Sequence, residues 1–394
     1  MTPDDALLAE CLATPDDDAP RLVWADSAGG ERGELVAIQC TLARGGNSPA
    51  ESGALRRRER ELLTTHGASW AAIGDLAKRC HFRRGFVEHV TLSAASFLEH
   101  GEALFDAAPF VRTVIIEGAS AEHVPALVDH RCFPRLRGFG ISGIEGKFPI
   151  ADAALAAVIE TDAYADLEAL YLHRIGPEQT TALIATNQLA ELTRLHLGIH
   201  TGEDASAVPP ILATATNVRA LAIDFVDETP ELFDALPQQL TELAIRASAL
   251  PRLSQQPQAA QIERLMLHGV TRGTLPELAT FSNLRVLGLD MGLYREPGLI
   301  EVGFADTPLP KLRELQATTE ITPAAIRAIA EKLGPQLEYF HLPGTPSESL
   351  DDIRTLVAGE VYGHAYRASL TRPLWAGELP HEPNWPQFVR FPSH

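Results

Sequence analysis

The chain has 394 residues, is 45% hydrophobic but only 6% aromatic, and carries a formal net charge of −19 at pH 7. That charge repels phosphate backbones, so we expect no nucleic-acid ligand. It favours a basic protein or peptide as the partner, although it also serves the solubility of a long open surface.

The N-terminus lacks the basic start and apolar core of a signal peptide. No apolar run reaches the roughly 18 residues of a membrane span, so no membrane contact is expected. The four cysteines, Cys11, Cys40, Cys80 and Cys132, form no C-x-x-C pair. They are predicted to be buried, reduced and small hydrophobic side chains, which indicates a cytoplasmic protein.

Residues 1–80 are predicted to form a helical domain, because apolar residues recur there at helical spacing. Asp16, Asp17 and Asp18 could bind a divalent cation, but helix capping suits them better, since no further oxygen ligands follow. The charges between Arg56 and Glu61 alternate in sign, which is typical of a solvated helix face. The expected helices cover residues 6–12, 20–26, 34–43 and 51–66.

Several short motifs in the first 110 residues resemble the bacterial repeat-companion domain. The motifs are Pro15–Asp26, Arg32-Gly-Glu34, Gln39-Cys40, Leu42-Ala43, Arg58–Leu62, His66-Gly67, Trp70 and Phe82–Glu88. The resemblance implies a small helical module placed ahead of leucine-rich or similar repeats. It implies no established catalytic activity, so no active-site residues are inferred from it.

A hexad of the form L-x-x-L-x-L, seen most clearly at Leu167–Leu172, recurs along the chain every 22 to 31 residues. This period is typical of a leucine-rich repeat solenoid, so the fold class is predicted to be α/β, with one parallel curved sheet and helices or turns on its convex side. Residues 85–92 and 95–107 behave as one further, capping repeat. The hexads begin at residues 111, 136, 167, 192, 218, 240, 262, 284, 312 and 337.

Positions one, four and six of each hexad should point into the core, because strand residues alternate faces. Convex helices are expected wherever the hexads lie 25 or more residues apart, and short turns or 3₁₀ helices where they lie 22 apart. The asparagine usual after such hexads is missing from nearly every repeat, so other groups must satisfy the buried backbone. The expected convex helices cover residues 121–130, 151–161, 177–186, 204–214 and 323–333.

Positions three, five and seven should project from the concave face of the sheet. Several of these positions hold tyrosine, arginine, methionine or histidine, and the first three of these are enriched at binding hot spots. The alternative is that such inner faces simply carry mixed polar residues. The candidate partner-binding residues are Tyr171, His173, Arg194, His196, Arg264, Met266, His268, Tyr339 and His341.

The favoured function is a non-enzymatic scaffold or adaptor that binds a protein or peptide, acting as a monomer and without a cofactor. No motif of a hydrolase, a nucleotide-binding protein or a metalloprotease is present, so no catalytic residue and no metal ligand is predicted. Two alternatives remain. The chain could be a regulatory or substrate-delivering companion of an enzyme, or His173, His196 and His200 could form a metal-dependent site.

The three expected domains are therefore residues 1–80, 81–344 and 345–394. The last begins with a helix predicted over residues 347–358 and continues with aromatic residues among prolines. That tail could cap the last repeat or bind a partner.

Overall fold

The computed structural model describes residues 3–119, 122–142, 167–172, 177–185, 188–198, 206, 208–224, 230–270, 275–290, 307–317, 323–343, 345 and 347–364. Contacts divide the described residues into two compact units. The first holds residues 3–47 and 55–169, and the second holds residues 48–54 and 170–364. The domain boundaries at residues 80 and 344 stay predictions.

The protein is α/β, with 13 strands ordered in the sheet as they are in the chain. The paired strands whose register is known are parallel, apart from the antiparallel first pair. The sequence predicted both the α/β class and the parallel pairing, while the leucine-rich repeat solenoid stays a prediction. None of the helices formed by the described residues is long and apolar enough to cross a bilayer.

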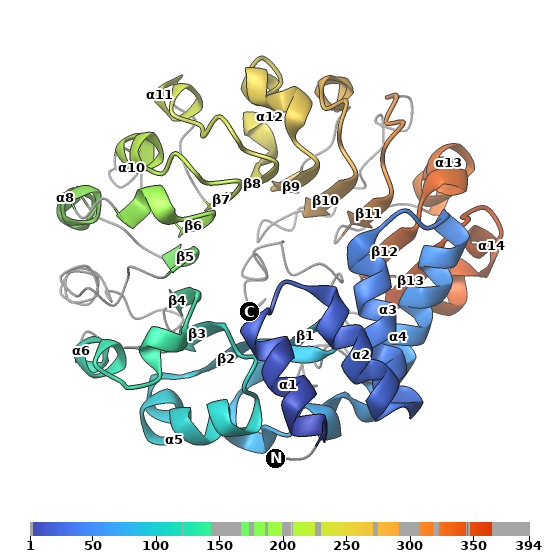
Figure 1. Ribbon diagram of the computed structural model, residues 1–394. Coiled ribbons are helices and arrows are strands. Elements are labelled where there is room, and N and C mark those ends of the chain that lie inside the picture. Colours follow the sequence, from blue (N-terminus) through green and yellow to red (C-terminus); the bar gives the residue numbers. More distant parts are fainter. Residues whose placement is uncertain are drawn as a thin grey trace. The chain divides into compact units, whose positions relative to one another are not determined.

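The first unit combines a helical region with the start of the sheet (Figure 1). Strands β3 and β4 of this unit each begin at position three of a hexad. The elements are α1 (Pro3–Ala13), α2 (Asp18–Ala28), α3 (Gly30–Arg44), α4 (Pro49–Ala71, shared with the second unit), β1 (Arg79–Arg83), β2 (Phe86–Ser93), α5 (Ala94–Ala107), β3 (Thr113–Glu117), α6 (His123–Val128) and β4 (Gly138–Ser142).

The four expected N-terminal helices are confirmed as α1 to α4, each longer than the apolar pattern alone indicates. The aspartate cluster does cap α2: Asp17 Oδ1 accepts a hydrogen bond from the Ala19 amide at 2.9 Å. The solvated face predicted for the charged run in α4 is wrong in part, because Arg56 and Glu59 are 4% and 1% exposed. The Gln39 amide donates to Glu59 at 2.6 Å, which gives that carboxylate a buried partner.

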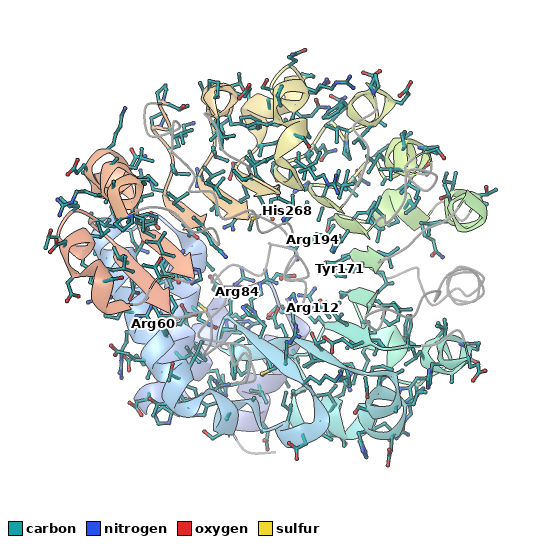
Figure 2. All side chains as sticks on the ribbon, turned by 180° about the vertical axis from the view of Figure 1, so that it is seen from behind. Arg60, Arg84, Arg112, Tyr171, Arg194 and His268 are labelled. Atoms are coloured by element: carbon teal, nitrogen blue, oxygen red, sulfur yellow. The ribbon has the colours of Figure 1, made fainter. Side chains whose placement is uncertain are left out.

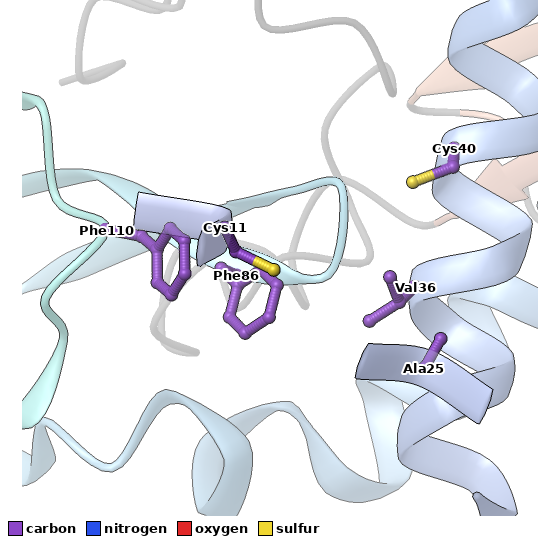
Figure 3. Packing of buried hydrophobic residues seen from close by; sticks show 6 residues of the cluster. All are labelled: Cys11, Ala25, Val36, Cys40, Phe86 and Phe110. Carbon is purple, nitrogen blue, oxygen red and sulfur yellow. The ribbon is translucent and has the colours of Figure 1, made fainter. Parts of the chain in front are cut away.

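A small apolar core holds the first unit together (Figure 3). Cys11, Ala25, Val36, Cys40, Phe86 and Phe110 form it. The rings of Phe86 and Phe110 stack with their centroids 4.0 Å apart. All four cysteines are free and buried, as the sequence predicted. Burial raises the pKa of both the Cys40 and the Cys80 thiols to about 12.

The Arg32-Gly33-Glu34 motif has a separate structural role for each residue. The Arg32 guanidinium lies 5.2 to 5.9 Å from the ring centroids of Trp24, Trp70, Phe82 and Phe86, and burial lowers its pKa to about 10. A Cβ on Gly33 would lie 2.2 Å from the Ala25 carbonyl oxygen, so glycine allows α3 to pack closely on α2. Glu34 accepts two hydrogen bonds from Arg58, at 2.8 and 2.9 Å.

The second unit consists of repeats in which each strand is followed by a helix or a turn. Helices α8, α10, α11 and α12 lie on one side of strands β6 to β9 (Figure 1). The elements are β5 (Ala169–Leu172), α8 (Pro177–Ala185), β6 (Arg194–Gly198), α10 (Val208–Thr214), β7 (Ala220–Asp224), α11 (Pro230–Asp234), β8 (Glu242–Arg246), α12 (Leu250–Leu253), β9 (Arg264–His268), β10 (Val286–Asp290), β11 (Glu314–Ala317), α13 (Pro323–Leu333), β12 (Tyr339–Pro343), α14 (Asp351–Arg354) and β13 (Glu360–His364).

The predicted convex helices are confirmed only in part. Helix α13 has the expected bounds, and α8 covers the predicted residues as far as Ala185, the last described residue there. Helix α6 is shorter than predicted, and residues 151–161 lie outside the described part of the chain. The 22-residue repeats contain short 3₁₀ helices, Pro257–Gln261 and Pro276–Thr280, as predicted, together with the one-turn helices α11 and α12. The helix predicted over 347–358 is replaced by a 3₁₀ turn and the short helix α14, and the unpredicted strand β13 follows.

A set of side-chain amides at exposed or partly exposed positions links neighbouring repeats, and we call it the amide ladder. Each donor is the residue directly before a hexad, and each acceptor is a backbone carbonyl just before the preceding hexad. All four hydrogen bonds measure 2.7 Å: Asn217 to Ala190, Gln261 to Gln238, Asn283 to Ala260, and Gln336 to Leu309. Lys311 continues the series by donating to the Asn283 side chain.

Candidate functional site

The concave face, formed by hexad positions three, five and seven, is built by the register of the second unit's strands. Each strand from β6 to β12 begins at position three of its hexad. Arg194 pairs with Ala220, and His196 with Ala222, and the same register continues to β13. Equivalent positions therefore lie side by side in rows, as the repeat pattern predicted.

The other positions of the hexads form the core, also as predicted. In the hexad at residue 192, Leu192, Leu195 and Leu197 are 2%, 1% and 0% exposed. Strand alternation then sends Arg194 and His196 to the opposite face. Because the three leucines are buried in the core, they fix the backbone positions of Arg194 and His196. They thereby determine the spacing between the rows of equivalent residues.

Position five differs from the expectation of an open surface. The side chains of Tyr171, His196, Met266 and His341 are only 7%, 6%, 8% and 0% exposed, and Tyr339 at position three is 3% exposed. Neighbouring strands lie about 4.8 Å apart, so large side chains in one row pack against each other along the sheet.

Tyr171 and His196 show this contact directly. Their rings meet edge to face, with centroids 6.4 Å apart. Burial raises the pKa of the Tyr171 phenol, although Arg194 opposes the shift. The predicted grouping of Tyr171, Arg194 and His196 is therefore present, while His173 and His200 lie outside the described residues.

The second predicted group lies on β9. The Met266 side chain extends over the neighbouring strand, where a Cβ added to Gly288 would lie 2.4 Å from its Cε atom. Met266 forms an apolar cluster with Ala222, Ala244 and Val286. Arg264 and His268 stand on either side of Met266 in the chain and stay partly exposed. The small residues at positions 222, 244 and 288 thus make room for methionine rather than leaving a gap.

A third group ends the sheet. The rings of Tyr339 and His341 lie 5.7 Å apart, and the ring of Tyr362 stacks on His341 at 5.3 Å. Tyr362 belongs to β13, which pairs in parallel with β12. Sequence reasoning missed it as a member of this row because the segment lacks the leucine hexad. The sequence feature that could have indicated β13 is the alternation of Val361 and Gly363, which follows β12 at about the spacing of one repeat.

The partly exposed side chains are the ones that a ligand could contact. Arg194 and His268, shown with Tyr171 in Figure 2, and Arg264 and Glu242 belong to this set. Position three alternates in sign across two neighbouring strands, since Glu242 on β8 pairs in register with Arg264 on β9. These groups can form hydrogen bonds and ion pairs with a peptide backbone or with charged side chains.

Within the described residues, no three histidine, cysteine, aspartate or glutamate side chains are arranged to hold a metal ion. The histidine-based metal site would also need His173 and His200, which the structure does not describe. That alternative stays a prediction, and so does the absence of catalysis.

No protein-family model matches the chain, and no curated protein matches it. Among solved structures, a chain of the Rad7–Elc1 complex from yeast has 12% identity over 94% of this chain and 99% of its own, with a TM-score of 0.42. An internalin from Listeria monocytogenes has 12% identity over 74% of this chain and 87% of its own, with a TM-score of 0.30. At these scores neither likeness assigns a function.

Proposed function

We propose that the protein is a non-enzymatic leucine-rich repeat scaffold that binds a protein or peptide through the concave face of its second unit. In this proposal the hexads build a solenoid, and the N-terminal helical module, which resembles the repeat-companion domain, caps its open end. The partner need not be basic, because the face carries both Arg264 and Glu242.

The single observation that carries the proposal is the register of the strands. It places Arg194, Glu242 and Arg264 in one row at position three, with His196 and Met266 in the row beside it. Arginine and methionine are enriched in protein interfaces, and a rigid sheet holds them at fixed spacing. Packing between neighbours restricts the buried aromatic rings, which lowers the entropy lost when a partner binds.

Affinity capture from the cells that naturally contain the protein tests the proposal. The baits are the wild-type chain, the double variant Arg194→Ala/Arg264→Ala, and the control Arg327→Ala, whose arginine lies on α13 and is 50% exposed. We expect a specific set of proteins to be lost with the double variant and retained with the control. Thermal unfolding of all three baits checks that their folds are equivalent.

Identical captured proteins for all three baits would count against this face. Tyr171 and His196 are poorer test positions, because both are nearly buried and their truncation would create cavities.

The capping role proposed for residues 1–80 has its own test. A chain that starts at residue 108 should expose the apolar end of the repeats and aggregate, as seen by size-exclusion chromatography with light scattering. A soluble, monomeric product would refute the capping role without touching the binding proposal.

A further inference from the structure

The turn of the first unit's hairpin places an arginine in an unfavourable backbone conformation. Strands β1 and β2 are joined by two residues, Arg84 with φ +48° and Gly85 with φ +88°. Two positive φ values in a two-residue loop are those of a type I′ turn, whose first position favours asparagine, aspartate or glycine. An arginine at this position destabilises the backbone by about 1 kcal/mol, which indicates a role for its side chain that offsets the cost.

Buried hydrogen bonds hold this turn in place. Arg21 is 0% exposed, and its Nη1 donates to the backbone carbonyls of Arg83 and Arg84 at 3.2 and 3.1 Å. The Gly85 amide donates to the Gln39 side chain at 2.6 Å. Because helices α2 and α3 supply these two partners, the turn is anchored and its arginine side chains start from fixed positions.

Three arginines converge on one exposed aspartate. Arg112 Nη1 lies 3.2 Å from Asp16 Oδ1, and Arg83 Nη1 and Arg84 Nη1 each lie 3.6 Å from the same atom. The arginine side chains are 16% to 22% exposed, whereas Asp16 is 63% exposed. Burial alone would raise the pKa of Asp16, but Arg112, Arg83 and Arg84 outweigh it and lower that pKa.

The charges around this cluster favour a bound anion. Besides Asp16, the three arginines contact three carboxylates, Asp18 at 2.7 Å, Glu88 at 3.3 Å and Glu168 at 3.7 Å. Glu88 also pairs with the buried Arg21 at 2.7 Å. Arg44 lies 3.9 Å from Asp18, so five guanidinium groups face three carboxylates when Asp16 is left out. The group that occupies the centre of the cluster in the structure is a carboxylate, that of Asp16.

We propose that Arg83, Arg84 and Arg112 form a carboxylate-binding cradle that Asp16 fills from within the chain, and that an aspartate or glutamate side chain of an acidic peptide displaces it. Asp16 lies in the short connection between α1 and α2, and its contacts are those of an exposed ion pair, which are weak. The exchange replaces one carboxylate with another, so the anchored arginines need not move. This site belongs to the first unit and is independent of the concave face.

Fluorescence anisotropy with a fluorescein-labelled Gly-Glu-Glu-Glu-Gly peptide tests the cradle in the full-length chain. Asp16→Asn keeps the size of the side chain and removes its charge, so we expect the peptide to bind more tightly, by up to about fivefold. Adding Arg112→Gln to that variant should reverse the gain. Arg79→Gln is the matched control, because Arg79 in the same unit pairs at the surface with Glu117, 3.5 Å away.

Arg84→Asn separates binding from folding. Asparagine suits the first position of a type I′ turn, so this variant should be no less stable than the wild type, yet it should bind the peptide more weakly. The proposal is overturned if Asp16→Asn binds no tighter than the wild type, or if Arg84→Asn and Arg112→Gln bind as Arg79→Gln does. Inorganic phosphate that competes more strongly than acetate would also overturn it, by showing a phosphate site.

Discussion

Arg21 and Glu88 form an ion pair in which both side chains are almost completely buried, at 0% and 1% exposure, with 2.7 Å between Arg21 Nη2 and Glu88 Oε1. The guanidinium lies 5.3 Å from the ring centroids of both Phe86 and Phe110. The pair thus joins α2 to β2 inside the aromatic core. Removing Arg21 leaves the buried Glu88 with Arg83, 3.3 Å away, as its remaining ion-pair partner, so a buried carboxylate loses its closest counter-charge.

We therefore expect Arg21→Met to reduce the free energy of unfolding by about 3–5 kcal/mol, measured by urea denaturation followed by circular dichroism. The double variant Arg21→Met/Glu88→Met should recover a large part of this loss, since neither charge is left alone. Equal losses in the single and double variants would show that the hydrogen bonds from Arg21 to the backbone matter more than the pair.

Gly85 combines a positive φ with a close neighbour. A Cβ at this position would lie 2.2 Å from Val36 Cγ2. Gly85→Ala should cost about 2–4 kcal/mol of unfolding free energy, from the left-handed backbone and from overpacking together. Gly74→Ala is the control, because φ there is +48° but no atom lies within 4 Å of the added Cβ, so only about 1 kcal/mol should be lost. Equal losses would rule out the overlap with Val36.

The amide ladder should stabilise the repeats measurably. Asn217→Ala removes the donor to the Ala190 carbonyl, and we expect it to cost about 0.5–1.5 kcal/mol in urea denaturation. Gln255→Ala, at an exposed position close to α12, should change stability by less than about 0.5 kcal/mol. A loss for Asn217→Ala as small as the control's would mean that water replaces the bond.

The cysteines should make stability depend on pH at the alkaline end. The thiols of Cys40 and Cys80 have pKa values raised to about 12, above the usual value near 9, because burial disfavours the thiolate. Their contribution to stability is complete below about pH 9 and is lost as the pH rises toward 12, since the unfolded chain releases these protons first. Denaturation midpoints between pH 8 and pH 11 would show this decline, and Cys40→Ala/Cys80→Ala should reduce it.

The repeats were predictable because their information is local. The pattern of a leucine hexad indicates which residues face the core, and the regular spacing of the hexads predicts that equivalent residues lie side by side in the sheet. The burial of His196 and His341 was not predictable in this way, because it depends on neighbours one repeat away that differ each time. Strand β13 was missed since Glu360–His364 lacks the leucine pattern.

The interior of the first unit was the least accessible to sequence reasoning. Arg21 is a charged residue, and its carboxylate partner lies 67 positions further along the chain. Composition places such residues at the surface. Likewise, Arg84-Gly85 is an unusual sequence for a hairpin turn, so β1 and the antiparallel pairing of the sheet's edge were not predicted. Apart from His173, which lies outside the described residues, the candidate binding residues lie in strands of the sheet, and their binding role stays a prediction.

The amide ladder also bears on how such a chain can change its length. Every donor stands directly before one hexad and reaches a carbonyl just before the previous hexad, whether the two lie 23 or 27 residues apart. The bond therefore depends on the junction between two repeats and not on the length of what lies between them. Duplicating or deleting a repeat between two of these junctions would again place a donor and an acceptor next to consecutive hexads, so the hydrogen bond could form in the altered chain.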